Sequence, residues 1–152
     1  MRQRDAELRR LSTRLQALAA EVGRERIAVC GDFNLDADAA PLVEWARTSE
    51  LRNAFVSAHG APLTSWNPAE NPNAQHSTRR RHPTGELKRG AALLYAAYDD
   101  QPQSPDHIFV GRGLEVQQIE PAFERPLGGS MTGQGPLMVS DHIGLQATLS
   151  VL

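Results

Sequence analysis

Apolar residues recur at every third or fourth position near the start of the chain, which is the spacing of one helix face. This stripe consists of Leu8, Leu11, Leu15, Leu18 and Val22. Charged residues lie off the stripe, and Gly23 follows it as a C-cap. The pattern predicts a helix over residues 4–22. Because a strand pattern begins a few residues later, docking of this helix on a sheet is the favoured interpretation. A short coiled coil would show the same spacing and is the alternative.

An uninterrupted apolar run, residues 27–30, is typical of a short buried strand and is followed by Gly31-Asp32-Phe33-Asn34. Since side chains two apart on a strand point the same way, Asp32 and Asn34 can face one site while Phe33 turns into the core. The pattern thus puts an acid and an amide on a rigid element, which catalysis and hard-metal binding both need. A plain turn is the alternative, because Gly, Asp and Asn are common after strands.

A second helix is predicted over residues 40–49, with Pro41 in its first turn and Asp36 or Asp38 as its cap. The residues expected on its buried side are Leu42, Val43 and either Trp45 or Ala46. Capping and solvent exposure are favoured over metal binding for both aspartates.

The chain becomes irregular between residues 57 and 90, where Pro, Asn, Ser and Gly are dense. We predict a long surface loop with a short strand at residues 63–66, and a flexible basic loop over residues 67–90. The basic residues of this loop are Arg79, Arg80, Arg81, Lys88 and Arg89. They favour either a solvated loop or an arm that binds phosphate above an active site. The regular aromatic spacing of a dedicated nucleic-acid platform is absent from this sequence.

Order returns over residues 91–95, and three further strand patterns follow at residues 105–110, 114–119 and 143–151. Together with the two helices, these strands predict an α+β fold. The chain has 152 residues, which is enough for one domain.

Composition excludes several classes of protein. The net charge of -2 gives no global basic field for nucleic acid, and a single cysteine, Cys30, cannot form an intrachain disulfide. Cys30 lies in the apolar run and is expected to pack as a small hydrophobic residue. No run approaches the roughly 20 apolar residues of a membrane span. The N-terminus lacks the apolar region of a signal peptide, so we expect a cytoplasmic protein, or a secreted one if a signal peptide lies upstream.

Three short motifs, each at one end of an apolar strand, present an acidic residue. They are Gly-Asp-Phe-Asn at 31–34, Pro-Asp-His-Ile-Phe at 105–109 and Ser-Asp-His at 140–142. In this order they closely resemble the endonuclease/exonuclease/phosphatase superfamily, which has the DNase I-like fold. The Thr-Ser-Trp-Asn-Pro stretch at 64–68 resembles a further segment of that family, and residues 98–102 resemble its sphingomyelinase-type phosphodiesterases.

The resemblance implies a role for each matching residue in the hydrolysis of a phosphate ester. Asp32 would orient or deprotonate the attacking water, and Asn34 would hydrogen-bond the phosphate and support Asp32. Asp106 would accept a hydrogen bond from His142 and hold its ring. Asp141 would be a metal ligand, and His142 would contact a non-bridging phosphate oxygen or transfer a proton.

The implied cofactor is Mg²⁺, with Mn²⁺ as a substitute, because carboxylate and amide oxygens form a hard site. A divalent ion and a cationic imidazole would both stabilise the negative charge that develops on the phosphate. Zinc bound by Cys30, His76 and His82 is the competing interpretation, but the spacing of these residues matches no zinc-finger pattern.

Substrate contacts are predicted for four residues, Trp66, Arg79, Arg80 and Arg81. Loop packing is the favoured interpretation of both His59 and Trp66, and a place at the border of the substrate groove is the alternative for Trp66. His107 stands where the family often has Tyr or another large residue, so no catalytic role is predicted for it. The basic loop favours DNA or RNA as the substrate, whereas the stretches at 64–68 and 98–102 favour a lipid-type phosphodiester.

The resemblance covers nearly the whole chain and implies half of a DNase I-like α/β sandwich, with one mixed, mostly antiparallel sheet and flanking helices. Residues 1–152 would be the C-terminal part of one such domain. The family's N-terminal half supplies an Asn, a metal-binding Glu and a His or Tyr that nothing before Arg4 provides. We therefore expect this chain alone to be inactive or impaired in catalysis, and to have an exposed sheet face that favours association. The alternative is a non-catalytic interaction module that pairs with an N-terminal half or with itself.

Overall fold

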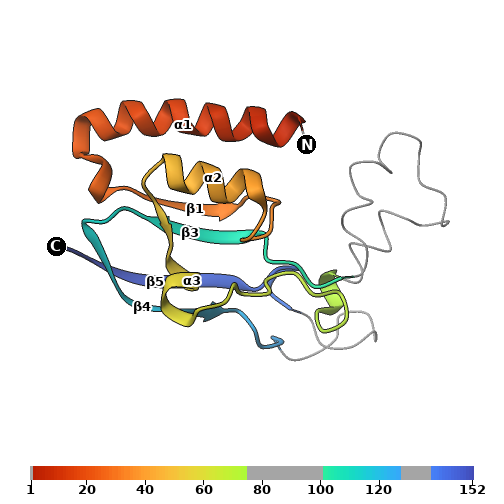
Figure 1. Ribbon diagram of the computed structural model, residues 1–152. Helices are drawn as coiled ribbons and strands as arrows, with labels where there is room; N and C mark the ends of the chain where they lie inside the picture. Colours follow the sequence, from red (N-terminus) through yellow and green to blue (C-terminus); the bar gives the residue numbers. More distant parts are fainter. Residues whose placement is uncertain (1, 75–100, 128–137) are drawn as a thin grey trace. The chain divides into compact units, whose positions relative to one another are not determined.

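The computed structural model describes residues 2–74, 101–127 and 138–152 (Figure 1). The chain divides into two compact units. The first unit consists of Met1–Leu63, Ser104–Glu120 and Leu145–Leu152, and the second consists of Thr64–Gln103 and Pro121–Gly144. That residues 1–152 are part of one domain stays a prediction.

Helices and strands are mixed along the described residues (Figure 1). The helices are α1 (Arg2–Val22), the short 3-10 helix η1 (Arg24–Arg26), α2 (Ala40–Thr48) and α3 (Ala54–His59). The strands are β1 (Ala28–Asp32), β2 (Arg52–Asn53), β3 (Asp106–Val110), β4 (Leu114–Ala122) and β5 (Gly144–Val151). This mixture of helices and antiparallel strands confirms the α+β class.

β3 is the central strand of a three-stranded sheet in the order β1-β3-β2, and both neighbours run antiparallel to it. The register pairs Ala28 with Val110 and Asp32 with Asp106. β4 and β5 form a separate two-stranded sheet, so the strands of the described residues belong to two sheets where one was expected. Because β1 and β2 occupy the two edges of β3, residues of β4 pack against side chains of β3 instead of extending its sheet.

α1 and α2 cover one face of the three-stranded sheet (Figure 1). The buried residues of this first cluster are Leu42, Trp45, Ala46, Leu51 and Phe109. The α1 stripe packs against them through its first three members, Leu8, Leu11 and Leu15. Leu18 and Val22 are 43% and 44% exposed, because the last turns of α1 extend past this cluster. Docking on a sheet is therefore confirmed for the first part of the stripe.

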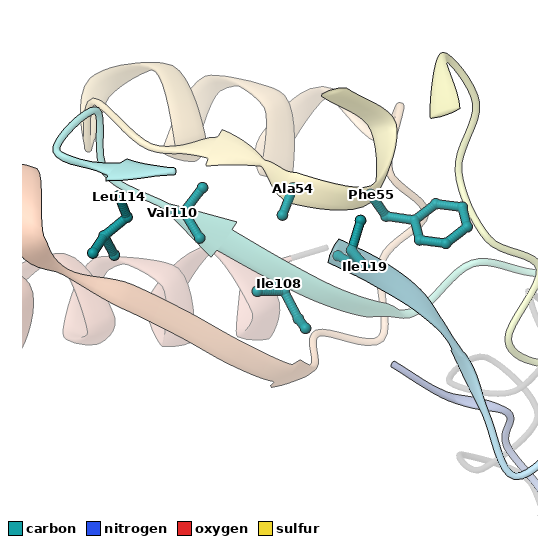
Figure 2. Close-up of a cluster of buried hydrophobic side chains, with 6 residues drawn as sticks. All are labelled: Ala54, Phe55, Ile108, Val110, Leu114 and Ile119. Atoms are coloured by element: carbon teal, nitrogen blue, oxygen red, sulfur yellow. The ribbon is translucent and has the colours of Figure 1, made fainter. Parts of the chain in front are cut away.

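A second hydrophobic cluster covers the other face of β3. Figure 2 shows its six buried residues, Ala54 and Phe55 of α3, Ile108 and Val110 of β3, and Leu114 and Ile119 of β4. Hydrophobic residues of β5 pack against this cluster. Alternate side chains of β3 thus enter two cores, Phe109 on one face and Ile108 with Val110 on the other, as the strand period of two requires.

β1 is an edge strand, and its exposed side corrects one prediction. By register, Ala28 and Cys30 share a face with Val110 and Ile108. The second cluster buries the two residues of β3 but leaves Ala28 and Cys30 exposed. The strand predicted at residues 27–30 is confirmed, but the prediction that Cys30 is buried there is wrong, because the described residues do not cover this face of β1.

The buried side of α2 also differs from its prediction. Val43 is 50% exposed, whereas Leu42, Trp45 and Ala46 are buried. Positions 42, 45 and 46 lie on one face of a helix with 3.6 residues per turn, and position 43 lies about 100° away from 42. The prediction of a buried Val43 is therefore wrong.

The start of α2 is not capped by an aspartate side chain. Pro41 lies in the first turn as predicted, but the N-cap residue is Ala39, and no side chain bonds to the helix end. The predicted cap at Asp36 or Asp38 is wrong. α3, in contrast, has a side-chain cap, because the side chain of Asn53 accepts a hydrogen bond from the Val56 N–H. This helix begins just before the stretch that was predicted to be irregular.

Several predictions fall outside the described residues. They concern the order at 91–95, residues 75–90 of the basic loop, residues 98–100, and the side chains of His76, Arg79, Arg80, Arg81, His82, Lys88 and Arg89. Within the described part of the chain, no helix is long and apolar enough to cross a membrane.

Candidate functional site

Two carboxylates lie opposite each other where the central strand pair of the first unit ends. Asp32 is the last residue of β1 and Asp106 is the first residue of β3, and the antiparallel register makes them partners. Asp32 is exposed and Asp106 is half-buried. Directly opposed like charges disfavour strand pairing.

The segment after β1 is a turn that holds the Asp32 carboxylate. The N–H of Asn34 donates a hydrogen bond to Asp32 Oδ1 at 2.7 Å. Asn34 has a left-handed φ of 51°, which Asn tolerates better than most residues, and Gly31 has a φ of 153° that favours glycine. The predicted turn is therefore present, with Asp32 and Asn34 both exposed, and the chemical interpretation of this motif stays a prediction.

Phe33 points away from the two polar residues on either side of it. Its ring lies 5.5 Å from the ring of Trp45 and 5.3 Å from the ring of Phe109. Phe33 packs against the first hydrophobic cluster, while Asp32 and Asn34 are exposed. The predicted packing of Phe33 into the core is confirmed, and the role of its two exposed neighbours stays a prediction.

Asp36 and Ser104 tie the turn to the start of β3, which the sequence did not reveal. Asp36 Oδ1 accepts hydrogen bonds from the N–H of Ser104 at 2.7 Å and from its hydroxyl at 3.2 Å. Ser104 Oγ accepts from the N–H of Ala37 at 3.3 Å. The N–H of Phe33 also donates to the carbonyl oxygen of Pro105 at 2.8 Å. These bonds fix the approach of the chain to Asp106.

His107 is buried next to Asp106 and contacts the same turn. Its Nε2 lies 2.8 Å from the carbonyl oxygen of Leu35. Burial lowers the pKa of His107 below its ordinary value of 6.5, although the bond to Leu35 and the nearby carboxylates of Asp106, Asp36 and Asp32 act in the opposite direction. This environment favours a neutral ring.

A cavity of about 260 Å³ adjoins Asp32 in the first unit. Arg4 and Glu7 of α1 line it together with residues 29–33 of β1 and its turn, and leucine side chains complete its walls. Groups of both charge signs thus border an open space beside the Asp32 carboxylate.

The second unit contains the Ser140-Asp141-His142 motif. The hydroxyl of Ser140 accepts a hydrogen bond from the N–H of His142 at 3.1 Å and lies 3.4 Å from Asp141 Oδ1. The ring of Trp66 meets the ring of His142 at 5.1 Å with an interplanar angle of 60°. Trp66 is 3% exposed, so in this structure it packs against the histidine, which agrees with the packing alternative. A substrate contact by Trp66 stays a prediction.

Two asparagine side chains hold the backbone on the N-terminal side of His142. Asn71 Nδ2 donates to the carbonyl oxygen of Ser140 at 3.1 Å, and Asn73 Nδ2 donates to that of Met138 at 2.8 Å. Asn71 Oδ1 accepts from the N–H of Asn73 at 2.9 Å. Sequence reasoning missed these supports, although dense asparagine in a loop is the signal for side chains that replace backbone partners.

An antiparallel bridge pairs Trp66 with Gln103 in the second unit. Trp66 and Gln103 exchange two backbone hydrogen bonds, at 3.1 Å and 2.8 Å. The strand predicted at residues 63–66 is reduced to this bridge. The N–H of Ile143 donates to the carbonyl oxygen of Ser65 at 2.8 Å, which joins the bridge to the histidine motif.

The predicted residues therefore fall into two groups. Asp32, Asn34 and Asp106 come together in the first unit, and Asp141 and His142 belong to the second. Among the described residues, no group of three or more His, Cys, Asp or Glu side chains could hold a metal ion. The described residues alone therefore do not complete a magnesium site.

The sequence matches the family model described as Endonuclease/Exonuclease/phosphatase family over residues 1–142. The matched span includes all three acidic motifs and both groups of candidate residues. No curated protein gave a significant match.

Proposed function

This chain belongs to the Endonuclease/Exonuclease/phosphatase family, and from that membership we propose that it hydrolyses a phosphate ester with a water molecule activated by Asp32. The family match supports a hydrolase of the phosphoesterase or nuclease type in general. The roles of single residues, the metal and the substrate are our proposal.

The observation that carries the proposal is the pairing of Asp32 with Asp106 at the ends of β1 and β3. An exposed carboxylate with one oxygen held by a backbone N–H keeps its second oxygen in a defined direction. Such a group can accept a proton from water that attacks phosphorus, and positioned general bases accelerate reactions about 10²–10⁴-fold. The cavity beside Asp32 supports access of a substrate to this carboxylate.

The proposed reaction forms a bond between the water oxygen and phosphorus and breaks the ester bond between phosphorus and the leaving oxygen. Asp32 takes the proton of the attacking water. Asn34 donates a hydrogen bond to a non-bridging oxygen, where negative charge develops. His142 contributes from the second unit, either to that charge or as the donor of a proton to the leaving oxygen. Asp106 holds the His142 ring in this proposal.

We also propose that the activity requires Mg²⁺, which Mn²⁺ would replace, with Asp141 as one ligand. A divalent ion would neutralise phosphate charge. Asp141 alone supplies too few oxygen ligands for Mg²⁺, which retains its waters and needs near-octahedral coordination.

The direct test is an assay of the purified chain on bis-p-nitrophenyl phosphate, p-nitrophenyl phosphate and plasmid DNA, with Mg²⁺, Mn²⁺ or a chelator. Turnover that is lost in Asp32→Ala and His142→Ala supports the proposal. Equal turnover in both variants and the parent chain contradicts it. The diester, the monoester and DNA separate the substrate classes, and the chelator tests the metal. For nucleic acid, the triple replacement of Arg79, Arg80 and Arg81 by Ser should weaken DNA cleavage more than diester cleavage.

A non-catalytic interaction module is the second candidate, and the exposed face of β1 favours it. Ala28 and Cys30 lie exposed on an edge strand. Unpaired strand edges can take up another strand. Sedimentation velocity across a range of concentrations tests this candidate, with Ala28→Lys as the blocking variant. Association that the variant abolishes, together with no turnover, supports the module, whereas an active monomer argues against it.

A further inference from the structure

His107 has no part in the proposed chemistry, yet it contacts the turn that carries Asp32 and Asn34. It is 3% exposed and lies opposite Gly31 in the pairing of β1 with β3. Its ring lies 5.7 Å from the ring of Phe33, the residue between Asp32 and Asn34. A buried polar ring needs partners for both nitrogens, so those partners indicate what the ring does.

Both ring nitrogens are hydrogen-bonded, and the partners define the tautomer. The carbonyl oxygen of Leu35, 2.8 Å from Nε2, can only accept, so Nε2 carries the proton. Asn53 Oδ1 accepts from the N–H of Val56 at 3.1 Å, and this leaves its Nδ2 to donate to His107 Nδ1 at 3.2 Å. The ring is therefore neutral, with a donor at one end and an acceptor at the other.

The bond to Leu35 acts on the geometry of the turn. Leu35 follows Asn34, whose left-handed φ of 51° is uncommon for a residue other than glycine. A carbonyl group fixed directly after such a residue restricts rotation of the peptide planes around it. The N–H of Asn34 in turn holds Asp32 Oδ1 at 2.7 Å. A continuous path of hydrogen bonds and covalent links thus joins the start of α3 to the Asp32 carboxylate.

We propose that His107 is a positioning residue, which keeps the Asp32–Asn34 turn in its active geometry by linking the Leu35 carbonyl to Asn53. The predicted effect on turnover rests on the proposed function, whereas the predicted effect on the order of the turn does not. His107 acts through the backbone and does not touch the reacting atoms.

The central experiment compares His107→Phe with His107→Gln by hydrogen exchange of the backbone amides. The Phe variant keeps a ring beside Phe33 but loses both hydrogen bonds. We expect exchange at residues 33–37 to accelerate about tenfold or more, since local opening becomes easier. The Gln variant retains a donor for the Leu35 carbonyl and should stay within about threefold of the parent chain. Unchanged exchange in the Phe variant, or equal acceleration at 33–37 and in β4, overturns the proposal.

Measurements of turnover distinguish a positioning role of His107 from a purely structural one. In His107→Phe we expect kcat to fall about 10–100-fold with KM within about threefold, because the base is misplaced while binding persists. The same substitution in an Asp32→Asn chain should cause no further loss, since the group that it positions is gone. Multiplied losses in the double variant contradict positioning. If the parent chain has no turnover, the proposed function fails, and the exchange data alone decide on the positioning.

A second variant keeps the proposal testable if His107→Phe does not fold. Asn53→Asp retains an acceptor for the Val56 N–H but replaces the donor to His107 Nδ1 with a carboxylate. ¹⁵N NMR of the imidazole at neutral pH should show the neutral Nε2–H tautomer in the parent chain and a doubly protonated ring in the variant. A ring that remains neutral in the variant, or an Nδ1–H tautomer in the parent chain, overturns the proposed link.

Discussion

The turn that carries Asp32 in the first unit and the segment that carries His142 in the second use the same local device. In each, a side chain accepts a hydrogen bond from the backbone N–H two residues later. Asp32 Oδ1 accepts from Asn34 at 2.7 Å, and Ser140 Oγ accepts from His142 at 3.1 Å. Turns of this kind set the direction of the residues in them from purely local sequence.

The supports behind the two segments are different. The Asp32 turn continues a strand, and the N–H of Phe33 still bonds to the Pro105 carbonyl. The His142 segment is held by the side-chain amides of Asn71 and Asn73 and by the backbone bond from the Ile143 N–H to the Ser65 carbonyl. Side-chain amides thus take a larger part in holding this segment than in holding the Asp32 turn, which continues the backbone pairing of β1 with β3. We therefore expect single substitutions to disturb the second segment more easily than the first.

The largest expected effect separates chemistry from structure at Asp32. Asp32→Asn keeps an oxygen for the Asn34 N–H but removes the base, so turnover should fall about 10²–10⁴-fold with little change in the melting temperature. The matched control is Asp38→Asn, which changes an exposed aspartate on the same connection. Turnover of bis-p-nitrophenyl phosphate measures both variants, and equal losses in the two would contradict the role of Asp32.

Asn71→Ala tests whether the second segment depends on one amide. Asn71 is 4% exposed, and its loss leaves the Ser140 carbonyl and the Asn73 N–H without their partner. We expect the free energy of unfolding to fall by about 1–3 kcal/mol. Hydrogen exchange should accelerate at residues 139–143 and not at 33–37. The control Asn67→Ala removes an exposed bond to the Ala69 N–H and should cost less. Equal acceleration of hydrogen exchange at residues 139–143 and 33–37 would contradict the expected difference between the two segments.

A pH dependence of stability is expected for the first unit. Burial lowers the pKa of His107 below 6.5, against the Leu35 bond and the carboxylates of Asp106, Asp36 and Asp32. Below pH 6.5 the unfolded chain therefore binds a proton at this ring before the folded chain does, so the free energy of unfolding falls as the pH falls towards the lowered pKa. The slope from this group is at most about 1.4 kcal/mol per pH unit. Denaturation curves of the parent chain and His107→Gln should diverge below pH 6.5, and parallel curves would refute the assignment.

The smallest expected effect concerns the local turn of the second segment. Ser140→Ala removes the acceptor of the His142 N–H. Because this residue is only half-buried, we expect a loss of about 0.5–1.5 kcal/mol in the free energy of unfolding, less than for Asn71→Ala. Ser140→Thr keeps the hydroxyl and should retain most of the stability. A loss in Ser140→Ala larger than that in Asn71→Ala would mean that the local turn, and not the amide clamp, holds the segment.

Sequence reasoning succeeded where a hydrophobic period acts over several residues. The α1 stripe and the strand pattern at residues 105–110 follow from helix and strand geometry. The division of Phe33 from its polar neighbours follows from the same geometry. These features need no knowledge of distant residues, which is why a single sequence predicts them.

The remaining features depend on residues far apart in the chain. Whether Cys30 or Val43 is buried depends on which surface lies against it, and local periodicity does not contain that information. The bonds from Asp36 to Ser104 and from Asn71 to Ser140 join positions that no periodic pattern relates. α3 spans only His59 and the five residues before it, too short for a helical stripe to emerge.

The bridge between Trp66 and Gln103 has a consequence for how this protein can change in evolution. It joins Trp66 to Gln103 with two backbone hydrogen bonds. Once the ends of a segment are tied, lengthening it adds only a slowly growing entropic penalty, about 0.6 kcal/mol for each doubling. Changes in the number of residues between Trp66 and Gln103 are therefore expected to cost little stability as long as these two bonds remain.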